Sequence, residues 1–257
     1  EMKPMNNDLL KARLNLHAVL RNLEDLPALD ARAAELIRAW RMAVCFSVHG
    51  GPAATLEFSD GRCRHYAACP PHPDVKLFFL SPAHLNAMFA GASSPLPLKG
   101  LSKLGFLKHE FAELTRRLQY FLRPEPERLA EPAYLRAHTL LTLLTGVFAV
   151  RHLVELDPVA AQLAAATPAG SLQFVVDSEG PVAHLVYGSN GVESRKGALD
   201  RPAARMWFAD WPAAYRVLSG KLDAFTATGK GLLRLDGTIP LIDNTSLIME
   251  RAAGYLA

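Results

Sequence analysis

The segment CRHYAACPPHPD contains two cysteines and two histidines close together: Cys63, His65, Cys69 and His72. Thiolates and imidazoles are common zinc ligands in proteins. However, this spacing is not that of a zinc finger or a zinc ribbon, and ligands that follow one another along one strand diverge instead of surrounding one ion. We therefore expect an ordinary strand and a proline-rich loop here, with no bound metal.

The motifs of several large enzyme classes are missing from the sequence. It has no G-x-S-x-G nucleophile elbow, no H-E-x-x-H zinc helix and no phosphate-binding loop. The glycine-containing segment from Thr226 to Gly231 lacks the Ser or Thr that must follow the lysine of such a loop. His84 and His109 fall on predicted helices and His184 on a predicted strand, with no obvious Ser and Asp partners. We therefore predict a non-enzymatic protein.

The composition is that of a globular protein with one large or two small domains. The chain has 257 residues, of which 50% are hydrophobic and 21% are charged. That is enough apolar material for a full core and too few charges for a disordered chain. The net charge is +3, and the densest basic cluster is Arg116-Arg117 on a predicted helix face. Without a longer basic run, we expect no nucleic-acid partner.

The cysteine count and the N-terminal sequence both favour the cytoplasm. Three cysteines are few and odd in number, which argues against a disulfide framework and fits a reducing compartment. The N-terminal sequence EMKPMNNDLLKARLNLHAVL lacks the apolar core and the cleavage site of a signal peptide. The most apolar stretch, Thr139 to Val150, is shorter than the roughly 20 residues that cross a bilayer. We expect a buried helix there and at most transient membrane contact, and the oligomeric state stays open.

Two segments of the chain follow the same pattern: an apolar strand, a proline near a helix start, and a helix that ends at glycine. They are LFFLSPAHLNAMFAG, residues 77–91, and MWFADWPAAYRVLSG, residues 206–220. Upstream of both, the related segments LDARAAELIRAW and LDPVAAQLAAAT place Asp30 and Asp157 at the N-cap of a predicted helix. Because the matches occur in the same order in both halves, they favour a duplicated domain over coincidence.

Each copy is predicted to run helix, helix, four strands, helix, strand, helix. The turns Gly51-Pro52 and Gly180-Pro181 each separate two apolar runs, as is typical of hairpins. We place the first copy at residues 1–123 and the second at residues 134–257. Residues 124–133 are rich in proline and charge and are predicted to form a linker.

The two copies differ after the shared glycine. In the second copy Gly220 leads into KLDAFTATGKGLLRLDG, whereas in the first copy Gly91 leads into the shorter ASSPLPLKG. Gly100 then matches Gly237 at the end of these segments. The missing residues place the ligand-binding ability of the first copy in question.

The segment from Met206 to Gly237 resembles the sterol carrier protein-2 (SCP2) domain. The family pattern is an apolar strand, a short helix, a Gly-Lys-Leu turn, an Ala/Phe-rich segment and a Gly-x-Leu-x-Leu-x-Gly strand. Matching positions are Gly220-Lys221-Leu222, Ala224-Phe225, Gly231, Leu233, Leu235 and Gly237. The resemblance covers roughly residues 135–257, and the first copy is similar to a divergent relative.

The resemblance implies an α/β (α+β) fold in each copy, with a five-stranded, mostly antiparallel sheet covered by helices. It further implies an apolar tunnel between sheet and helices that binds a fatty acid, an acyl-CoA, a sterol or a similar apolar molecule for transfer or presentation. No cofactor is implied.

The second copy supplies apolar side chains from several elements that could line such a tunnel. The predicted ligand-binding residues are Met206, Phe208, Tyr215, Leu218, Phe225, Leu233, Leu235, Ile248 and Met249. Burial of an acyl chain contributes about 0.8 kcal/mol per methylene, so a long chain needs few polar contacts. The same residues would also suit a filled core. The alternative is a ligand-free scaffold or accessory protein that docks a partner enzyme of lipid or quinone metabolism.

Overall fold

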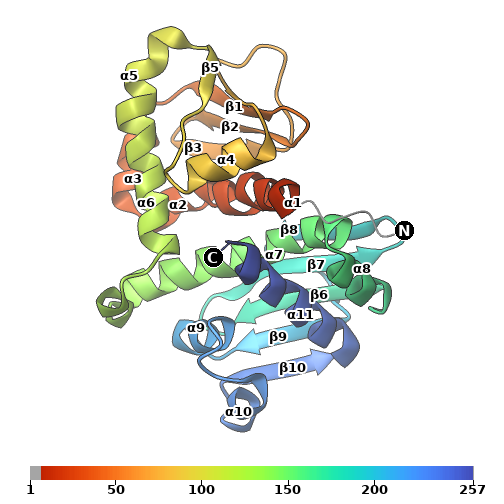
Figure 1. The fold of residues 1–257 in the computed structure, drawn as a ribbon. Helices are drawn as coiled ribbons and strands as arrows, with labels where there is room; N and C mark the ends of the chain where they lie inside the picture. Colours follow the sequence, from red (N-terminus) through yellow and green to blue (C-terminus); the bar gives the residue numbers. More distant parts are fainter. Residues whose placement is uncertain (1–6, 257) are drawn as a thin grey trace. The chain divides into compact units, whose positions relative to one another are not determined.

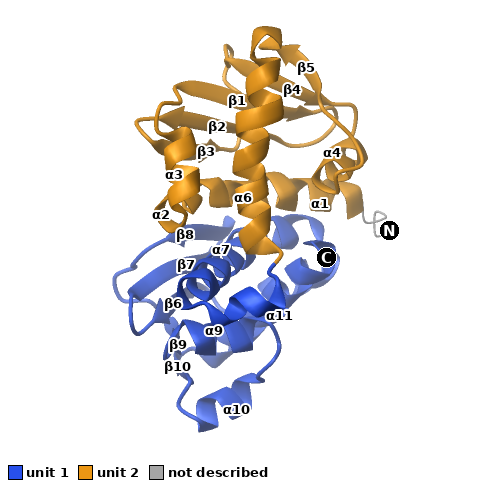
Figure 2. Ribbon diagram, turned by 90° about the vertical axis from the view of Figure 1, so that its left-hand side faces the viewer, with its two compact units in different colours: residues 1–5, 124–257 blue, residues 6–123 orange. Residues whose placement is uncertain are grey.

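The computed structural model describes residues 7–256, so the ends of the predicted domains, residues 1–6 and Ala257, lie outside the described part. The described chain forms two compact units (Figure 2), residues 7–123 and residues 124–256. We call them the N-terminal unit and the C-terminal unit. The segment predicted as a linker, residues 124–133, belongs to the C-terminal unit and contains the short helix η5 (Pro126–Ala130).

The N-terminal unit begins with a broken helical segment, continues with a sheet, and ends with a helix. The leading segment comprises α1 (Asn7–Leu14), η1 (Asn15–Val19), η2 (Leu20–Glu24), α2 (Leu26–Leu29) and α3 (Ala31–Ile37). The sheet region comprises β1 (Met42–Val48), β2 (Ala53–Ser59), β3 (Arg62–Tyr66), β4 (Val75–Phe79), α4 (Pro82–Phe89) and β5 (Leu96–Lys99). The closing segment comprises η3 (Leu101–Lys103), α5 (Leu104–Phe106), η4 (Leu107–Phe111) and α6 (Ala112–Leu122).

The C-terminal unit has the same order of strands, with an additional helix before its last strand and fewer helical segments before and after the sheet. After η5 come two helices, α7 (Pro132–Leu156) and α8 (Pro158–Ala165). The sheet region comprises β6 (Gly170–Val176), β7 (Gly180–Gly188), β8 (Gly191–Lys196), β9 (Ala204–Phe208), α9 (Trp211–Leu218), α10 (Ala224–Gly229) and β10 (Leu233–Gly237). The unit ends with α11 (Ile239–Leu256). The additional helix, α10, lies between α9 and β10, whereas no helix lies between α4 and β5 in the N-terminal unit.

The two sheets share one topology. Each has five strands, in the order β3-β2-β1-β4-β5 and, read from the other edge, β8-β7-β6-β9-β10. One pair in each sheet is parallel, β1 with β4 and β6 with β9, and the remaining pairs are antiparallel. The predicted fold class is therefore confirmed. A common origin of the two units stays a prediction with which this identical strand order agrees.

Helices cover one face of the C-terminal sheet (Figure 1). The helix α11 contacts β6, β9 and β10, while α7 contacts β7 and β8. Both helices lie on the same face, because Tyr187 hydrogen-bonds Thr245 in α11 and Ser194 hydrogen-bonds the carbonyl of Val147 in α7. Along β9 the residues alternate between buried and half-buried, as expected for a strand with one covered face.

The helix α7 is longer than the apolar stretch that the sequence suggested. It runs for 25 residues, so its length and composition alone would allow it to cross a membrane. However, 56% of its most apolar window is buried inside the protein, and fourteen of its residues are buried. Its apolar character is therefore explained by its position as the core helix of the C-terminal unit.

The two repeated segments form strand-to-helix corners, as predicted. The side chains of Ser81 and Asp210 accept hydrogen bonds from the backbone N–H groups of His84 and Ala213, at 3.2 Å and 2.7 Å, and so cap α4 and α9. The glycines that follow the helices, Gly91 and Gly220, have φ of 76° and 68°, the left-handed backbone that ends many helices.

A second pair of matched positions, Asp30 and Asp157, also lies at helix N-caps as predicted. Asp30 caps α3 and Asp157 caps α8. In addition, each carboxylate binds an arginine from the last helix of its own unit. Arg117 donates two hydrogen bonds to Asp30, at 2.7 Å and 2.9 Å, and Arg251 donates to Asp157 at 2.7 Å. Each aspartate therefore caps one helix and also binds the last helix of its unit.

The predicted match between Gly100 and Gly237 is visible in their backbone geometry. Gly100 has φ of 85° and Gly237 has φ of 87°. A Cβ on Gly237 would lie 2.1 Å from the carbonyl oxygen of Ala203, and a Cβ on Gly100 would lie 2.9 Å from that of Asp74. Both positions require glycine because of the close backbone and the positive φ.

We expect Gly237→Ala to lower the free energy of unfolding of the C-terminal unit by about 2 kcal/mol. The matched control is Gly220→Ala, because Gly220 also has positive φ but its Cβ would meet no atom within 4 Å. That control has only the left-handed strain, about 1 kcal/mol. Chemical denaturation of the two variants measures the difference, and equal losses would show that contact with Ala203 is unimportant.

The cysteine count argued against a disulfide framework, but one disulfide is present. Cys45 of β1 and Cys69, in the loop after β3, form a disulfide with their Cα atoms 5.5 Å apart. An odd number of cysteines still allows one pair to bond. In addition, β2 separates β3 from β1 in the sheet, and only the loop after β3 brings Cys69 back to Cys45. The third cysteine, Cys63, is buried on β3 and takes no part in the bond.

Candidate ligand-binding site

Four of the predicted ligand-binding residues lie together on β9 and β10. Phe208 pairs with Leu233 and Met206 pairs with Leu235 in the antiparallel ladder, so all four side chains lie on one face of the sheet. Met206, Phe208 and Leu233 are buried, and Leu235 on the edge strand is half-buried. The helix α11 packs against these strands, so this is the helix-covered face.

The two predicted residues of α11 have different surroundings. Ile248 is buried and lies on the same stripe of the helix as Thr245 and Ala252. Met249 is half-buried, and its methyl group would be 2.7 Å from a Cβ placed on Gly146 of α7. Met249 therefore belongs to the contact between α7 and α11, where the glycine makes room for it.

The predicted residues of α9, Tyr215 and Leu218, are half-buried at the border of the site. The ring of Tyr215 contacts the imidazole of His138 in α7 edge to face, with the ring centres 5.7 Å apart. Its hydroxyl accepts a hydrogen bond from the Lys221 ammonium group at 2.7 Å. Tyr215 thus has an apolar side toward α7 and a polar end toward solvent.

Phe225 differs from the other eight predicted residues, which are buried or half-buried. It lies on α10 and is 90% exposed. Aromatic side chains are usually buried, so its type suggested a place in the pocket. The six-residue helix that carries it leaves only Ala227 buried.

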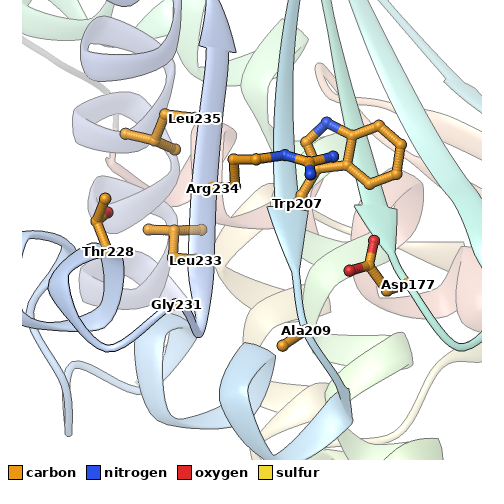
Figure 3. A pocket seen from close by; sticks show the side chains of 8 residues that line it. All are labelled: Asp177, Trp207, Ala209, Thr228, Gly231, Leu233, Arg234 and Leu235. Carbon is orange, nitrogen blue, oxygen red and sulfur yellow. The ribbon is translucent and has the colours of Figure 1, made fainter.

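A hollow of about 320 Å³ lies beside these residues at the edge strand β10 (Figure 3). Its lining residues, which together define the β10 hollow, are Asp177, Trp207, Ala209, Thr228, Gly231, Leu233, Arg234 and Leu235. Leu233 and Leu235 belong to the predicted set, and the other six do not. The sequence held a signal for Trp207 and Arg234. They alternate along their strands with the predicted residues Met206 and Leu233, so they belong to the opposite face of the same two strands. The volume is near the lower end of the range for small-molecule sites, about 300–1,000 Å³.

Polar groups mark one side of the β10 hollow. The guanidinium carbon of Arg234 lies 4.5 Å from the ring centre of Trp207, which is a cation–π contact. The indole Nε1 of Trp207 is buried and has no hydrogen-bond partner among residues 7–256. Figure 3 shows Asp177 and Arg234 near the Trp207 ring, and Leu233 and Leu235 pointing the other way. An acceptor group on a ligand could bind the indole N–H or the guanidinium.

Tyr187 and Thr245 form an uncharged polar pair between the sheet and α11. The hydroxyl groups of Tyr187 and Thr245 are 2.9 Å apart and buried. Burial raises the pKa of Tyr187 to about 12, and the hydrogen bond with Thr245 offsets only part of this effect. Tyr187 is therefore uncharged at neutral pH, and the two hydroxyl groups satisfy each other within an apolar interior.

The four side chains weighed as zinc ligands do not form one site. Cys69 is bonded to Cys45, and His65 makes a 2.9 Å hydrogen bond with the carbonyl of Leu16. Cys63 is buried on β3, and His72 is exposed. Within the described range, no group of three or more His, Cys, Asp or Glu residues is arranged to hold a metal ion.

The comparisons with known proteins give only partial structural similarities. No family model and no curated protein matches the sequence. Among solved structures, the sterol carrier protein domain 2 of Helicoverpa armigera is 15% identical, with a TM-score of 0.34 over 44% of this chain and 89% of its own. Sterol carrier protein 2-like 2 of Aedes aegypti is 13% identical (TM-score 0.30; 42% of this chain, 95% of its own). A conserved hypothetical protein of Thermus thermophilus is 24% identical (TM-score 0.30; 42% and 83%).

Proposed function

We propose that the C-terminal unit binds a lipid or another apolar small molecule without chemical change, and transfers or presents it. The observation that carries this proposal is the β10 hollow beside an apolar, helix-covered sheet face. Leu233 and Leu235 belong to both. The resemblance of residues 206–237 to the SCP2 domain supports the same function.

The residues that line the β10 hollow fit a ligand with an apolar chain and a polar end. The chain would pack against Leu233 and Leu235 and extend under α11 toward Met206 and Ile248. The polar end would pass around the edge strand β10 to Arg234 and the Trp207 N–H on the other face of the sheet. Ten buried methylenes contribute about 8 kcal/mol, which corresponds to a Kd of about 1 µM before the costs of association.

We expect Leu235→Trp to weaken the binding of a fluorescent fatty acid by at least about tenfold, because the indole would occupy the hollow. Leu235 is half-buried on an edge strand, so the fold should tolerate the larger side chain. Titration of the full chain with the fluorescent fatty acid measures the effect.

The matched control is Leu247→Trp, which makes the same change at an exposed position of α11. Its affinity should stay within about twofold of the wild type, as expected for a surface substitution. Equal affinities for the two variants would place the ligand elsewhere. Failure of the wild-type chain to take up any fatty acid would contradict the proposal itself.

A further inference from the structure

An exposed group of leucines lies at the edge of the N-terminal sheet, where β5 is the outermost strand (Figure 2). Five leucines of this region are between 36% and 63% exposed. They define the leucine patch: Leu80, Leu96, Leu98, Leu101 and Leu104. Single exposed apolar residues are normal on protein surfaces, but four leucines within nine consecutive residues are a concentration that marks interaction sites.

The strand pairing explains why these leucines point outward. Leu96 lies opposite the half-buried Phe78 of β4. Phe78 and Leu96 therefore lie on the less buried face of the sheet, whereas Leu77 points to the buried face. The register of β4 and β5 shifts by one residue at Lys76, which leaves Leu98 as the extra residue of a β-bulge. Leu101 and Leu104 follow three residues apart in consecutive helical turns, so they lie on one side.

Lysines lie close to the leucine patch in the sequence and on the neighbouring strand. Residues 96–108 contain Lys99, Lys103 and Lys108 and no Asp or Glu. Lys76 of β4 lies opposite Lys99 in the ladder. The Lys103 ammonium is 3.8 Å from a carboxylate oxygen of Asp74, and both side chains are partly exposed, so this contact neutralises little of the charge. This part of the chain therefore combines exposed leucines with positively charged lysines.

A β-strand from another chain is a poor partner for this edge. Pro95 and Pro97 supply no backbone N–H, and Lys99 places a charge on the strand itself. Prolines and lysines on an edge strand are the features that prevent sheet extension. Exposed leucines with lysines nearby instead match the chemistry of a bilayer surface, which offers acyl chains beneath anionic phosphates.

We propose that the leucine patch and its lysines form a docking surface for an anionic lipid bilayer. The leucines enter the boundary between headgroups and acyl chains, and Lys76, Lys99, Lys103 and Lys108 bind lipid phosphates. None of these residues lines the β10 hollow, so this function goes beyond ligand binding by the C-terminal unit. In this account, the copy with the shortened segment provides contact with the membrane.

Vesicle binding by the full chain tests the proposal. The wild type should co-sediment with vesicles made of equal parts phosphatidylcholine and phosphatidylglycerol, and bind more weakly to phosphatidylcholine alone or at high salt. The double variant Leu98→Glu, Leu101→Glu should lose at least about tenfold in partitioning. The double variant Lys99→Gln, Lys103→Gln should lose binding to the anionic vesicles only, by roughly fivefold per lysine.

The control makes the same charge change at exposed apolar positions of the other unit, with Val159→Glu and Leu247→Glu, and should bind as the wild type. If circular dichroism shows that the glutamates disturb the fold, Leu98→Ser with Leu101→Ser decides instead.

Unchanged binding of the patch variants, equal loss in the control, or no vesicle binding by the wild type would overturn the proposal. A patch variant that changes only the sedimentation coefficient would do so too, because it would show self-association. Fatty-acid uptake, measured separately, should be unaffected by the patch variants.

Discussion

Replacing Asp157 with alanine is expected to lower the free energy of unfolding of the C-terminal unit by about 3 kcal/mol. Its side chain is fully buried and is held by hydrogen bonds from four groups. One carboxylate oxygen accepts from the backbone N–H groups of Val159 and Ala160 at 2.8 Å and 3.2 Å. The other accepts from Arg251 at 2.7 Å and from the Tyr255 hydroxyl at 2.8 Å.

The expected loss has two parts. Removal of the N-cap of α8 costs about 1 kcal/mol. Removal of one partner from a buried ion pair costs about 3–5 kcal/mol when the remaining charge stays buried. The Arg251 side chain is 32% exposed and can turn toward water in the variant, so we reduce this second part to about 2 kcal/mol.

The same carboxylate makes stability depend on pH. Burial alone would raise the pKa of Asp157, but the hydrogen bonds from Arg251, Tyr255 and the two backbone N–H groups together lower it below the ordinary value. Because the pKa in the folded state is below the unfolded value of about 3.9, the contribution is complete above that value and is lost as pH falls through the folded pKa. Asp157→Asn should therefore lose less stability between neutral and acidic pH than the wild type.

Guanidinium denaturation of the full chain measures these losses, and peptide-resolved hydrogen exchange assigns them to the C-terminal unit. Asp243→Ala, on the exposed side of α11, is the control and should stay within about 0.5 kcal/mol of the wild type. An Asp157→Ala variant as stable as this control would show that the contacts between α8 and α11 do not depend on the carboxylate.

Removal of the Cys45–Cys69 disulfide is expected to cost the N-terminal unit about 3 kcal/mol. The two cysteines are 24 positions apart in the sequence, and a closed loop of that length restricts the unfolded chain strongly. The bond also fixes the loop after β3 to β1 in the middle of the sheet. Reduction should destabilise the wild type by this amount.

Thiol titration tests the disulfide first. The unreduced, unfolded chain should show one thiol, that of Cys63, and all three cysteines should react after reduction. The double variant Cys45→Ala, Cys69→Ala should be insensitive to reductant, which separates loss of the bond from other effects of the reagent. Three thiols before reduction would contradict the bond. One thiol with unchanged stability on reduction would show that the bond contributes little.

The parts of the fold that depend on local rules could be predicted from the sequence. Apolar runs separated by Gly-Pro turns predicted the strands. Asp30 and Asp157 were recognised as N-caps because a carboxylate before an apolar helical stripe is a local signal. The match of Gly100 with Gly237 followed from the spacing of elements. These features need no knowledge of distant contacts. The structure confirms the strands and the two N-caps, and the match of the two glycines stays a prediction with which their similar positive φ agrees.

The features that depend on distant contacts could not be predicted in this way. The arginines that bind the N-cap carboxylates, Arg117 and Arg251, come from helices at the other end of each unit. The disulfide joins Cys45 to a loop that only the sheet topology brings near. Phe225 was expected in a pocket because of its type, yet its short helix α10 leaves it exposed. Residue type sets a preference, and the path of the backbone decides where the side chain lies.

Native mass spectrometry of the full chain purified from cells tests the central proposal most directly. We expect a species heavier than the bare chain by the mass of one lipid, which organic extraction removes and which is depleted in Leu235→Trp but not in Leu247→Trp. A chain that carries only its own mass and also takes up no fluorescent fatty acid would contradict ligand binding. That result would favour the ligand-free scaffold that docks a partner enzyme.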